Sequence, residues 1–315
     1  MVVPPHDRQL FSSQALVFAQ TNLNALSGLL LRSLSTEAGD RFDNATAGAS
    51  GGWVRLGGSW LSASDPFRAV DYGLAAGGDA AVGRDGRLGA TIGYDSATLT
   101  DSTGGSTSQQ SVSVSLYGSQ DAGGAVISAA VSYAHAWNNS RRATGAGPVT
   151  ASWGSDAFTG GAQIAVPLSL AGFAVTPIAG VVVSNISSPA FTEHDGQLHG
   201  FGVRAGATNF TGVEPFAAVD LARPFTTGGG TTITPDVMVG YRYDRAAASG
   251  GGQTLTAADG TVFAGNGLSL NPNTAIVGAG LSAQKNHFNA FVRYDATVSS
   301  NWSDQSVTAG IRLSF

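Results

Sequence analysis

Apolar and polar residues alternate with a period of two along most of the chain after Gly51. Between Val307 and Phe315 every odd-numbered residue is apolar, and every even-numbered residue is polar or glycine. Residues 288–297, 236–244 and 71–79 repeat this pattern. Because successive residues of a strand point to opposite sides, each segment has one apolar and one polar face.

Together with the turn residues, the alternation predicts twelve strands. We expect them near residues 52–61, 69–82, 87–100, 108–120, 125–139, 150–168, 172–187, 202–224, 232–246, 273–284, 287–299 and 304–315. Gly, Asp and Asn favour tight turns at 83–86, 121–124 and 285–287. Longer polar loops, notably 247–272, interleave with these turns. An even strand number and turns of unequal length are typical of outer-membrane barrels.

The residues on the polar faces decide between a soluble sandwich and a membrane barrel. A face that meets bulk water usually carries many Lys and Glu residues, whereas these faces carry Gly, Ser, Thr and a few Arg and Asp, and Lys285 is the only lysine. The apolar faces carry aromatic residues that suit the membrane interfaces, namely Trp60, Tyr72, Tyr94, Tyr133, Trp137, Tyr243 and Tyr294. The pattern therefore predicts an all-β transmembrane barrel of twelve antiparallel strands.

Charged residues on the polar faces are predicted to point into the lumen. They are Arg55, Asp71, Asp79, Arg87, Glu214, Asp220, Asp236, Arg242, Asp244, Arg293, Asp295 and Arg312. One interpretation is that they hydrate the pore and orient an internal helix through Arg8, Arg32, Glu37 and Arg41. The other is that they pair with one another to avoid an unsatisfied interior.

The N-terminal segment has a helical pattern instead. From about Arg8 to Ala38, leucines recur at spacings of three, four and seven, no proline interrupts them, and Gly39 follows. About 30 residues at ~1.5 Å each would span ~45 Å, enough to cross a membrane-thick structure. Its Gln and Asn residues make the helix too polar for lipid, so we expect it to thread through the pore. We divide the chain into helix and linker (1–50) and barrel (51–315).

Composition disfavours nucleic-acid-binding proteins and proteins anchored by a membrane-spanning helix. The net charge of −5 and the single lysine give no basic surface for nucleic acid, and the chain has no cysteine. No apolar run approaches the ~20 residues of a membrane-spanning helix, and residues 1–8 do not resemble a secretory signal. A barrel must still be exported, so we expect the chain to be part of a longer precursor.

In order and spacing, several segments resemble the C-terminal β-barrel translocator domain of classical (type Va) autotransporters. They are Trp53–Trp60 (WVRLGGSW), Tyr72–Asp79 (YGLAAGGD), Gly86–Tyr94 (GRLGATIGY), Phe191–Glu193 (FTE), Val277–Leu281 (VGAGL) and Tyr294–Asp295. The resemblance implies a domain of the Gram-negative outer membrane that contacts lipid, is a monomer, and helps to export and display a covalently attached upstream passenger. An outer-membrane channel with a helical plug and no passenger is the alternative.

The last eight residues, TAGIRLSF, are similar to the assembly signal of outer-membrane barrels. Its characteristic positions are Gly310, Leu313 and the terminal Phe315. As an edge strand with an apolar face, this segment could pair with a strand of the barrel-assembly machinery.

No pattern predicts a catalytic residue, a cofactor site or a metal site. Residues 48–52 match the hydrolase pattern G-x-S-x-G but lie in a glycine-rich linker rather than at a strand-to-helix turn. The five histidines are dispersed, and His194 and His199 have no evident third ligand. In serine-protease autotransporters an Asn-Asn pair of the pore helix cyclises and releases the passenger. Residues 19–24 (AQTNLN) resemble that stretch, but Thr21 replaces the first Asn, which disfavours the mechanism.

Overall fold

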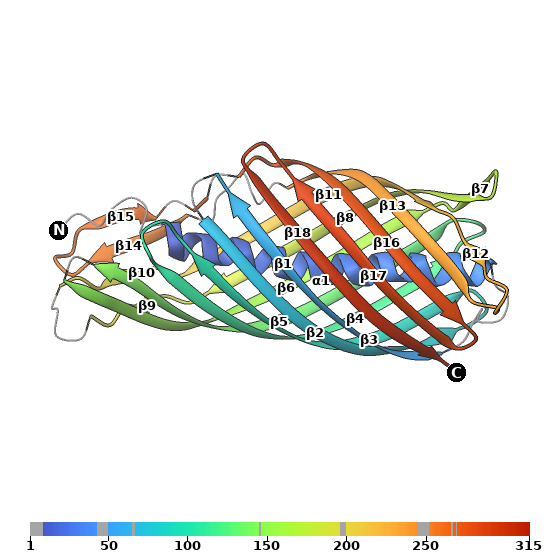
Figure 1. The fold of residues 1–315 in the computed structure, drawn as a ribbon. Coiled ribbons are helices and arrows are strands. Elements are labelled where there is room, and N and C mark those ends of the chain that lie inside the picture. The colour runs from blue at the N-terminus through green and yellow to red at the C-terminus, as the bar shows by residue number, and fades with distance from the viewer. Residues whose placement is uncertain are drawn as a thin grey trace.

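A long helix enclosed by an antiparallel β-barrel makes up the fold (Figure 1). The computed structural model describes residues 9–42, 50–64, 67–144, 146–195, 200–244, 252–265, 267–268 and 270–315. The helix, α1, runs from Gln9 to Phe42 and lies along the barrel axis. It extends past the predicted end at Ala38, because Gly39 does not interrupt it. No helix among the described residues is long and apolar enough to cross a membrane.

Twelve strands close the barrel. They are β1 (Gly51–Ala63), β2 (Phe67–Val82), β3 (Gly86–Thr100), β4 (Ser106–Asp121), β5 (Val126–Thr144), β6 (Gly147–Ala165), β8 (Phe173–Ser188), β11 (Thr208–Ala222), β13 (Thr232–Tyr243), β16 (Asn273–Lys285), β17 (Phe288–Val298) and β18 (Trp302–Ser314). The first and last strands pair along their length, with Gly51 opposite Ser314 and Ala63 opposite Trp302. The predicted twelve-stranded barrel is thus confirmed.

Two predicted elements differ in the structure. The strand expected at 202–224 is divided into β10 (Val203–Ala205) and β11, and only β11 belongs to the barrel wall. The loop expected at 247–272 contains a hairpin of β14 (Gln253–Ala257) and β15 (Val262–Gly265). Together with β9 (Phe191–Thr192) these strands form a separate sheet in the order β15-β14-β10-β9. Their non-local pairing could not be seen in the local pattern.

The two ends of the barrel have different connections. We call the end that carries the small sheet the cap end, and the end that carries Phe315 the turn end (Figure 1). The turn end includes the turns at 83–85, 122–125 and 286–287, and two longer connections that contain β7 (Leu168–Leu170) and β12 (Phe225–Thr226). At the cap end only the connections after β8 and β13 are long, and the others are tight. The predicted difference between short turns at one end and long loops at the other is therefore seen for two loops only.

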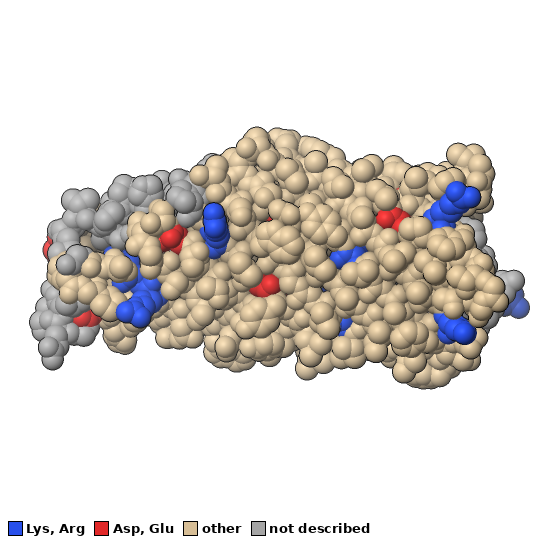
Figure 2. All heavy atoms as spheres, viewed as in Figure 1, with Lys and Arg blue, Asp and Glu red and all other residues tan. Residues whose placement is uncertain are grey.

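An apolar belt covers the outside of the barrel, and charged side chains are sparse over the middle of the visible face (Figure 2). The seven predicted interfacial Trp and Tyr residues are all among the exposed large side chains. All except Tyr133 lie in the half of their strand nearer the cap end. The sequence predicted aromatic residues at the interfaces; in the structure all but Tyr133 lie in the cap-end half of the wall, and we call these the girdle.

Single cysteines in this Cys-free chain should reveal the orientation in the membrane. We expect the cap end to face outside, because the short turns and the C-terminus of such barrels are periplasmic. On intact cells a membrane-impermeant maleimide should label Ala258→Cys in the β14–β15 turn and spare Ala122→Cys in the β4–β5 turn. Both side chains are exposed. Both variants should be labelled once the outer membrane is permeabilised; the reverse pattern on intact cells would contradict the orientation.

Candidate functional site

The candidate functional site is the lumen with its helix. Five consecutive helix residues, Ala15–Ala19, are all buried, and Phe18 is completely buried. They pack against apolar residues that come from all around the wall, including Leu61, Leu99, Ile186 and Trp302. A helix buried on every side is not amphipathic. We call this contact zone the collar; it is apolar and closely packed, although the sequence had left open a lumen hydrated by charged residues.

Side-chain amides fasten the helix to the wall beside the collar. Gln14 Nε2 donates to Asn138 Oδ1 at 2.8 Å, and both side chains are buried. Asp304 Oδ2 on β18 accepts hydrogen bonds from Gln20 Nε2 at 3.0 Å and from Asn24 Nδ2 at 2.8 Å. The Asn24 amide is therefore engaged by the wall. Because each bond needs one height and one rotation of the helix, the set fixes the position of α1 in the barrel.

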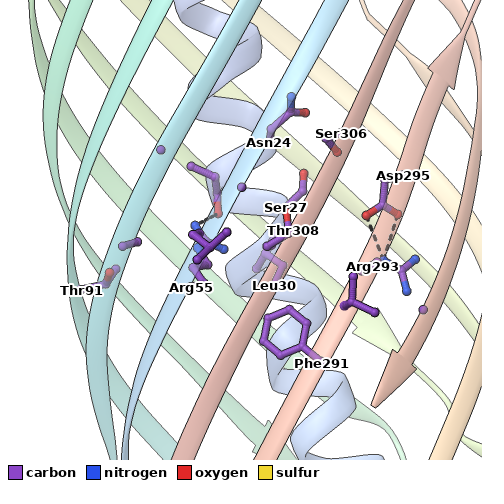
Figure 3. Close-up of a pocket in the computed structure, with 18 of the residues that line it drawn as sticks. Asn24, Ser27, Leu30, Arg55, Thr91, Phe291, Arg293, Asp295, Ser306 and Thr308 are labelled. Atoms are coloured by element: carbon purple, nitrogen blue, oxygen red, sulfur yellow. Dashed lines mark hydrogen bonds and ion pairs between the residues drawn. The ribbon is translucent and has the colours of Figure 1, made fainter. Parts of the chain in front are cut away.

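Toward the turn end the helix is off-centre. Leu26 and Leu30 pack toward β5, β6 and β8, where their methyl groups would lie 3.1 and 3.2 Å from a Cβ atom at Gly161. Gln163 Nε2 on β6 also donates to the carbonyl oxygen of Leu30 at 3.1 Å. A cavity of about 320 Å³ remains mainly on the opposite side; Asn24, Ser27 and wall residues mostly from β1–β3, β13 and β16–β18 line it (Figure 3).

Arg55 bridges this cavity and contacts the helix directly. Its Nη2 donates to the carbonyl oxygen of Ala25 at 2.9 Å. A Cβ atom at residue 28 would collide with the guanidinium, so Gly28 permits the close approach. Among the predicted lumen residues, Arg55 is the one with a described hydrogen bond to the helix. The other half of that hypothesis rested on Arg8, which lies outside the described residues, and on Arg32, Glu37 and Arg41, whose side chains are not described.

Asp79 is the centre of an ion-pair cluster near the turn end. Its carboxylate accepts from Arg312 at 2.6 and 2.7 Å, from Arg87 at 2.9 Å and from the hydroxyl of Tyr117 at 2.9 Å. The side chains of Asp79 and Arg312 are only 3% and 7% exposed. Four strands, β2, β3, β4 and β18, thus meet at one buried carboxylate across the closure of the barrel.

The remaining predicted charges are distributed along the inner wall. Arg293 pairs with Asp236, and its Nε donates to Asp295 at 2.9 and 3.0 Å. Glu214 forms an ion pair with Arg242 at 3.5 Å. Ser59 donates to Asp71 through its backbone N–H at 2.9 Å and through its hydroxyl. Asp220 lies on the inward face of β11, and Asp244 is buried just beyond the end of β13. Pairing, the second interpretation, describes most of these contacts.

Several lumen residues were missed from the sequence. Asp304 lies on the same face of β18 as Arg312, four steps of the alternation away, and Asp95 continues the inward face of β3. Extending the alternation toward the cap end would have found both. Gln14, Asn138 and Gln163 carry no such signal, because a buried amide is recognised only by its partner.

The cap sheet clasps the start of the helix. The ring of Phe11 contacts Trp153 and Phe191 edge-on at 6.1 and 5.3 Å between centroids, and those two rings are stacked at 4.0 Å. A buried ion pair joins Arg142 on β5 to Glu193 at 2.6 Å and anchors the sheet to the wall.

In the loop that follows β9, the backbone N–H groups of Gly200 and its neighbours hold the pKa of Asp195 below its ordinary value.

The residues weighed from the sequence for a metal site or for hydrolase chemistry do not come together among the described residues. Among the described residues, no group of three His, Asp or Glu side chains could hold a metal ion. His194 pairs through its backbone with Thr150, and His199 lies outside the described residues, as do Gly48 and Ala49 of the hydrolase-like pattern. Of the C-terminal signal residues, Leu313 and Phe315 point outward, 55% and 81% exposed, while Gly310 faces the ring of Phe291 inside the barrel.

Comparison with known proteins identifies the family. The family model described as the autotransporter β-domain matches residues 52–295. This chain belongs to the autotransporter β-domain family. No curated protein matches the sequence.

Solved structures of autotransporters share the fold at low sequence identity. The translocator domain of NalP from Neisseria meningitidis has a TM-score of 0.74 and 17% identity, with 97% of this chain and 99% of that chain covered. The β-domain of BrkA from Bordetella has a TM-score of 0.63 and 19% identity, over 85% of this chain and 100% of that chain. The transport unit of AIDA-I from Escherichia coli has a TM-score of 0.54 and 14% identity, over 84% and 90%.

Membership places this autotransporter β-domain in the outer membrane of a Gram-negative bacterium. It serves as the translocator of a covalently linked passenger, and the domains of this family are transport modules. The alternative of a channel without a passenger is not favoured.

Asp79→Asn should destabilise the barrel, because it leaves the buried Arg87 and Arg312 without their carboxylate. Removing one partner of a buried ion pair costs about 3–5 kcal/mol. Urea unfolding in lipid vesicles should show a loss of this size. Asp85→Asn in the exposed β2–β3 turn is the matched control and should change little. Equal unfolding free energies for both variants would show that the cluster is not a structural centre.

Proposed function

We propose that α1 is the translocator's plug and tether: it fills the lumen and keeps a passenger attached at the cap end. The observation that supports this best is the collar, in which Ala15–Ala19 are buried on all sides by the wall. A plug that seals the pore must leave no continuous water layer. The amide bonds to Asn138 and Asp304 keep the helix from sliding.

The direction of the chain supports the same role. The helix begins beneath the cap sheet with Phe11 clasped, and runs toward the turn end, where β1 begins at Gly51. A passenger joined ahead of α1 would therefore stand at the cap end, which the proposed orientation places outside the cell. The barrel would anchor it there without any covalent reaction. We assign no catalytic residue to this domain.

We further propose that Gly310, Leu313 and Phe315 are read by the barrel-assembly machinery before the barrel closes. In the folded chain β18 pairs with both β17 and β1, so its edges are occupied. Recognition must then precede closure, while one edge is still open. We also propose that the closed barrel works as a monomer, because pairing β1 with β18 leaves no strand edge in lipid for a second copy.

Removal of the helix should open the pore. The intact chain should show small conductance in a planar bilayer, and a variant lacking residues 1–45 should conduct far more, because a helix about 10 Å wide leaves the lumen. Circular dichroism of both proteins should first show the same β-structure. Large and equal conductance in both would favour an open channel over a plugged translocator.

Changes at the C-terminus should reduce assembly in cells. Deletion of Phe315 or Leu313→Asp should lower surface levels several-fold, since the docking strand loses part of its apolar face. A lipid-facing Asp also destabilises the inserted barrel, although by less than the ~2–4 kcal/mol that Arg or Lys costs at the midplane. Val262→Asp, on the exposed β15, introduces the same charge outside the barrel wall and should assemble normally. Normal surface levels of the first two variants would refute the signal.

A further inference from the structure

Two arginines on the outer wall are not explained by translocation. Arg68 on β2 and Arg141 on β5 lie on the outward faces of their strands, near the cap end, and both are exposed. Neither forms an ion pair or hydrogen bond with any described residue. Across the sheet, Arg68 stands opposite Thr100, Thr100 opposite Ser106, and Ser106 opposite Arg141. One row of the sheet thus carries a cation at each end, about 14 Å apart, with hydroxyls between.

The neighbouring row nearer the belt is also rich in hydrogen-bonding groups. It contains Thr98, Ser108, Asn139 and Ser152, and the Ser152 hydroxyl donates to Asn139 Oδ1 at 2.7 Å. Below this row come the aromatic residues Tyr72 and Trp137 of the girdle. The outer face of β2–β6 therefore changes from apolar, through aromatic, to hydroxyl-rich with two cations. We call the part above the girdle, from Arg68 to Ser152, the rim face.

Other cations on the outside of the described wall are elsewhere. Arg84, Arg223 and Lys285 lie at the turn end, and Arg204 lies on the cap sheet. Arg223 is already engaged, with its guanidinium 5.0 Å from the ring of Phe173. Figure 2 shows most of the visible Lys and Arg toward the two ends of this face. At the cap end of the barrel wall, the described cations are confined to the rim face.

The height of the rim face indicates which molecule covers it. Strands β5 and β6 continue for seven residues beyond Trp137, to Thr144. With a strand tilt near 40°, this extension rises about 18 Å above Trp137. The interfacial layer of a phospholipid bilayer is only about 5–8 Å thick on each side. The tilt also places Arg141 about 9 Å higher than Arg68. A thin headgroup could reach Arg68 but not both arginines.

We propose that the rim face binds the phosphorylated oligosaccharide headgroup of an outer-leaflet glycolipid. Arg68 and Arg141 bind phosphate groups at two heights, because a guanidinium donates a pair of hydrogen bonds that match phosphate oxygens. The Ser, Thr and Asn side chains between them bond with sugar hydroxyls, and Trp137 marks the boundary of the acyl chains. The proposal rests on the orientation in which the cap end faces outside.

Binding can be measured on the intact 315-residue chain in phosphatidylcholine nanodiscs, by native mass spectrometry during titration with lipooligosaccharide. The double variant R68Q/R141Q should bind about tenfold more weakly than the unchanged protein. R84Q at the turn end is the matched control and should bind as the unchanged protein does. Chemical dephosphorylation of the lipid should weaken binding to the unchanged protein and abolish the difference from R68Q/R141Q.

Three results would overturn the proposal. They are equal affinity of the unchanged protein and R68Q/R141Q, an equal loss in R84Q, and equally tight binding of phosphatidylglycerol, which offers phosphate without a sugar chain. Both positions are exposed and tolerate a polar side chain, so R68Q/R141Q should fold. Its circular dichroism spectrum checks this separately. Binding in nanodiscs does not depend on orientation in the cell, so failure here is distinguishable from failure of the cysteine-labelling test.

Discussion

The structure depends on one constraint: lipid offers no hydrogen-bond partners to the backbone. Strands can cross the membrane only if every edge is paired, which forces β1 onto β18 along the whole length of both. Closure then divides all wall residues into an outer and an inner set that alternate along each strand. The apolar belt, the lumen charges and the confinement of the helix all follow from this division.

A closed wall creates an interior that must be filled. The chain fills it in two ways along the axis. In the collar, small and apolar wall residues fit around Ala15–Ala19, so the seal consists of close packing. Toward the turn end the helix leans on β5, β6 and β8, and the other side holds water-accessible space crossed by Arg55. A tight seal at one level and a looser, polar fit at another suit a segment that must pass through the barrel and then stop.

Buried charge has a structural role in this lumen. Asp79 joins β2, β3 and β18, so it fastens the seam where the first and last strands close the barrel. Arg142 and Glu193 fasten the cap sheet to β5 in the same way. Outside, the exposed Arg68 and Arg141 are available to a partner in the surrounding leaflet. Arginine therefore forms buried ion pairs that hold the interior together, and on the outer wall it is exposed to the surroundings of the protein.

The sequence by itself determined what is local and periodic. Alternation along strands such as 304–315 predicted the barrel, its strand number and the face of each predicted charge, because a period of two fixes the side to which a side chain points. The spacing of leucines predicted the helix. Order along the chain, from Trp53–Trp60 to the terminal Phe315, indicated the family.

Tertiary structure alone decided which residues meet. The cap sheet joins β9 and β10 to a hairpin some fifty residues away, and Phe11 enters it from the other end of the chain. Asp304 accepts hydrogen bonds from Gln20 and Asn24 only because the helix lies at one particular height in the barrel. Such contacts depend on the shear of the closed sheet and on the rotation of the helix. Neither quantity leaves a periodic trace in the sequence, because each results from the packing of the whole wall.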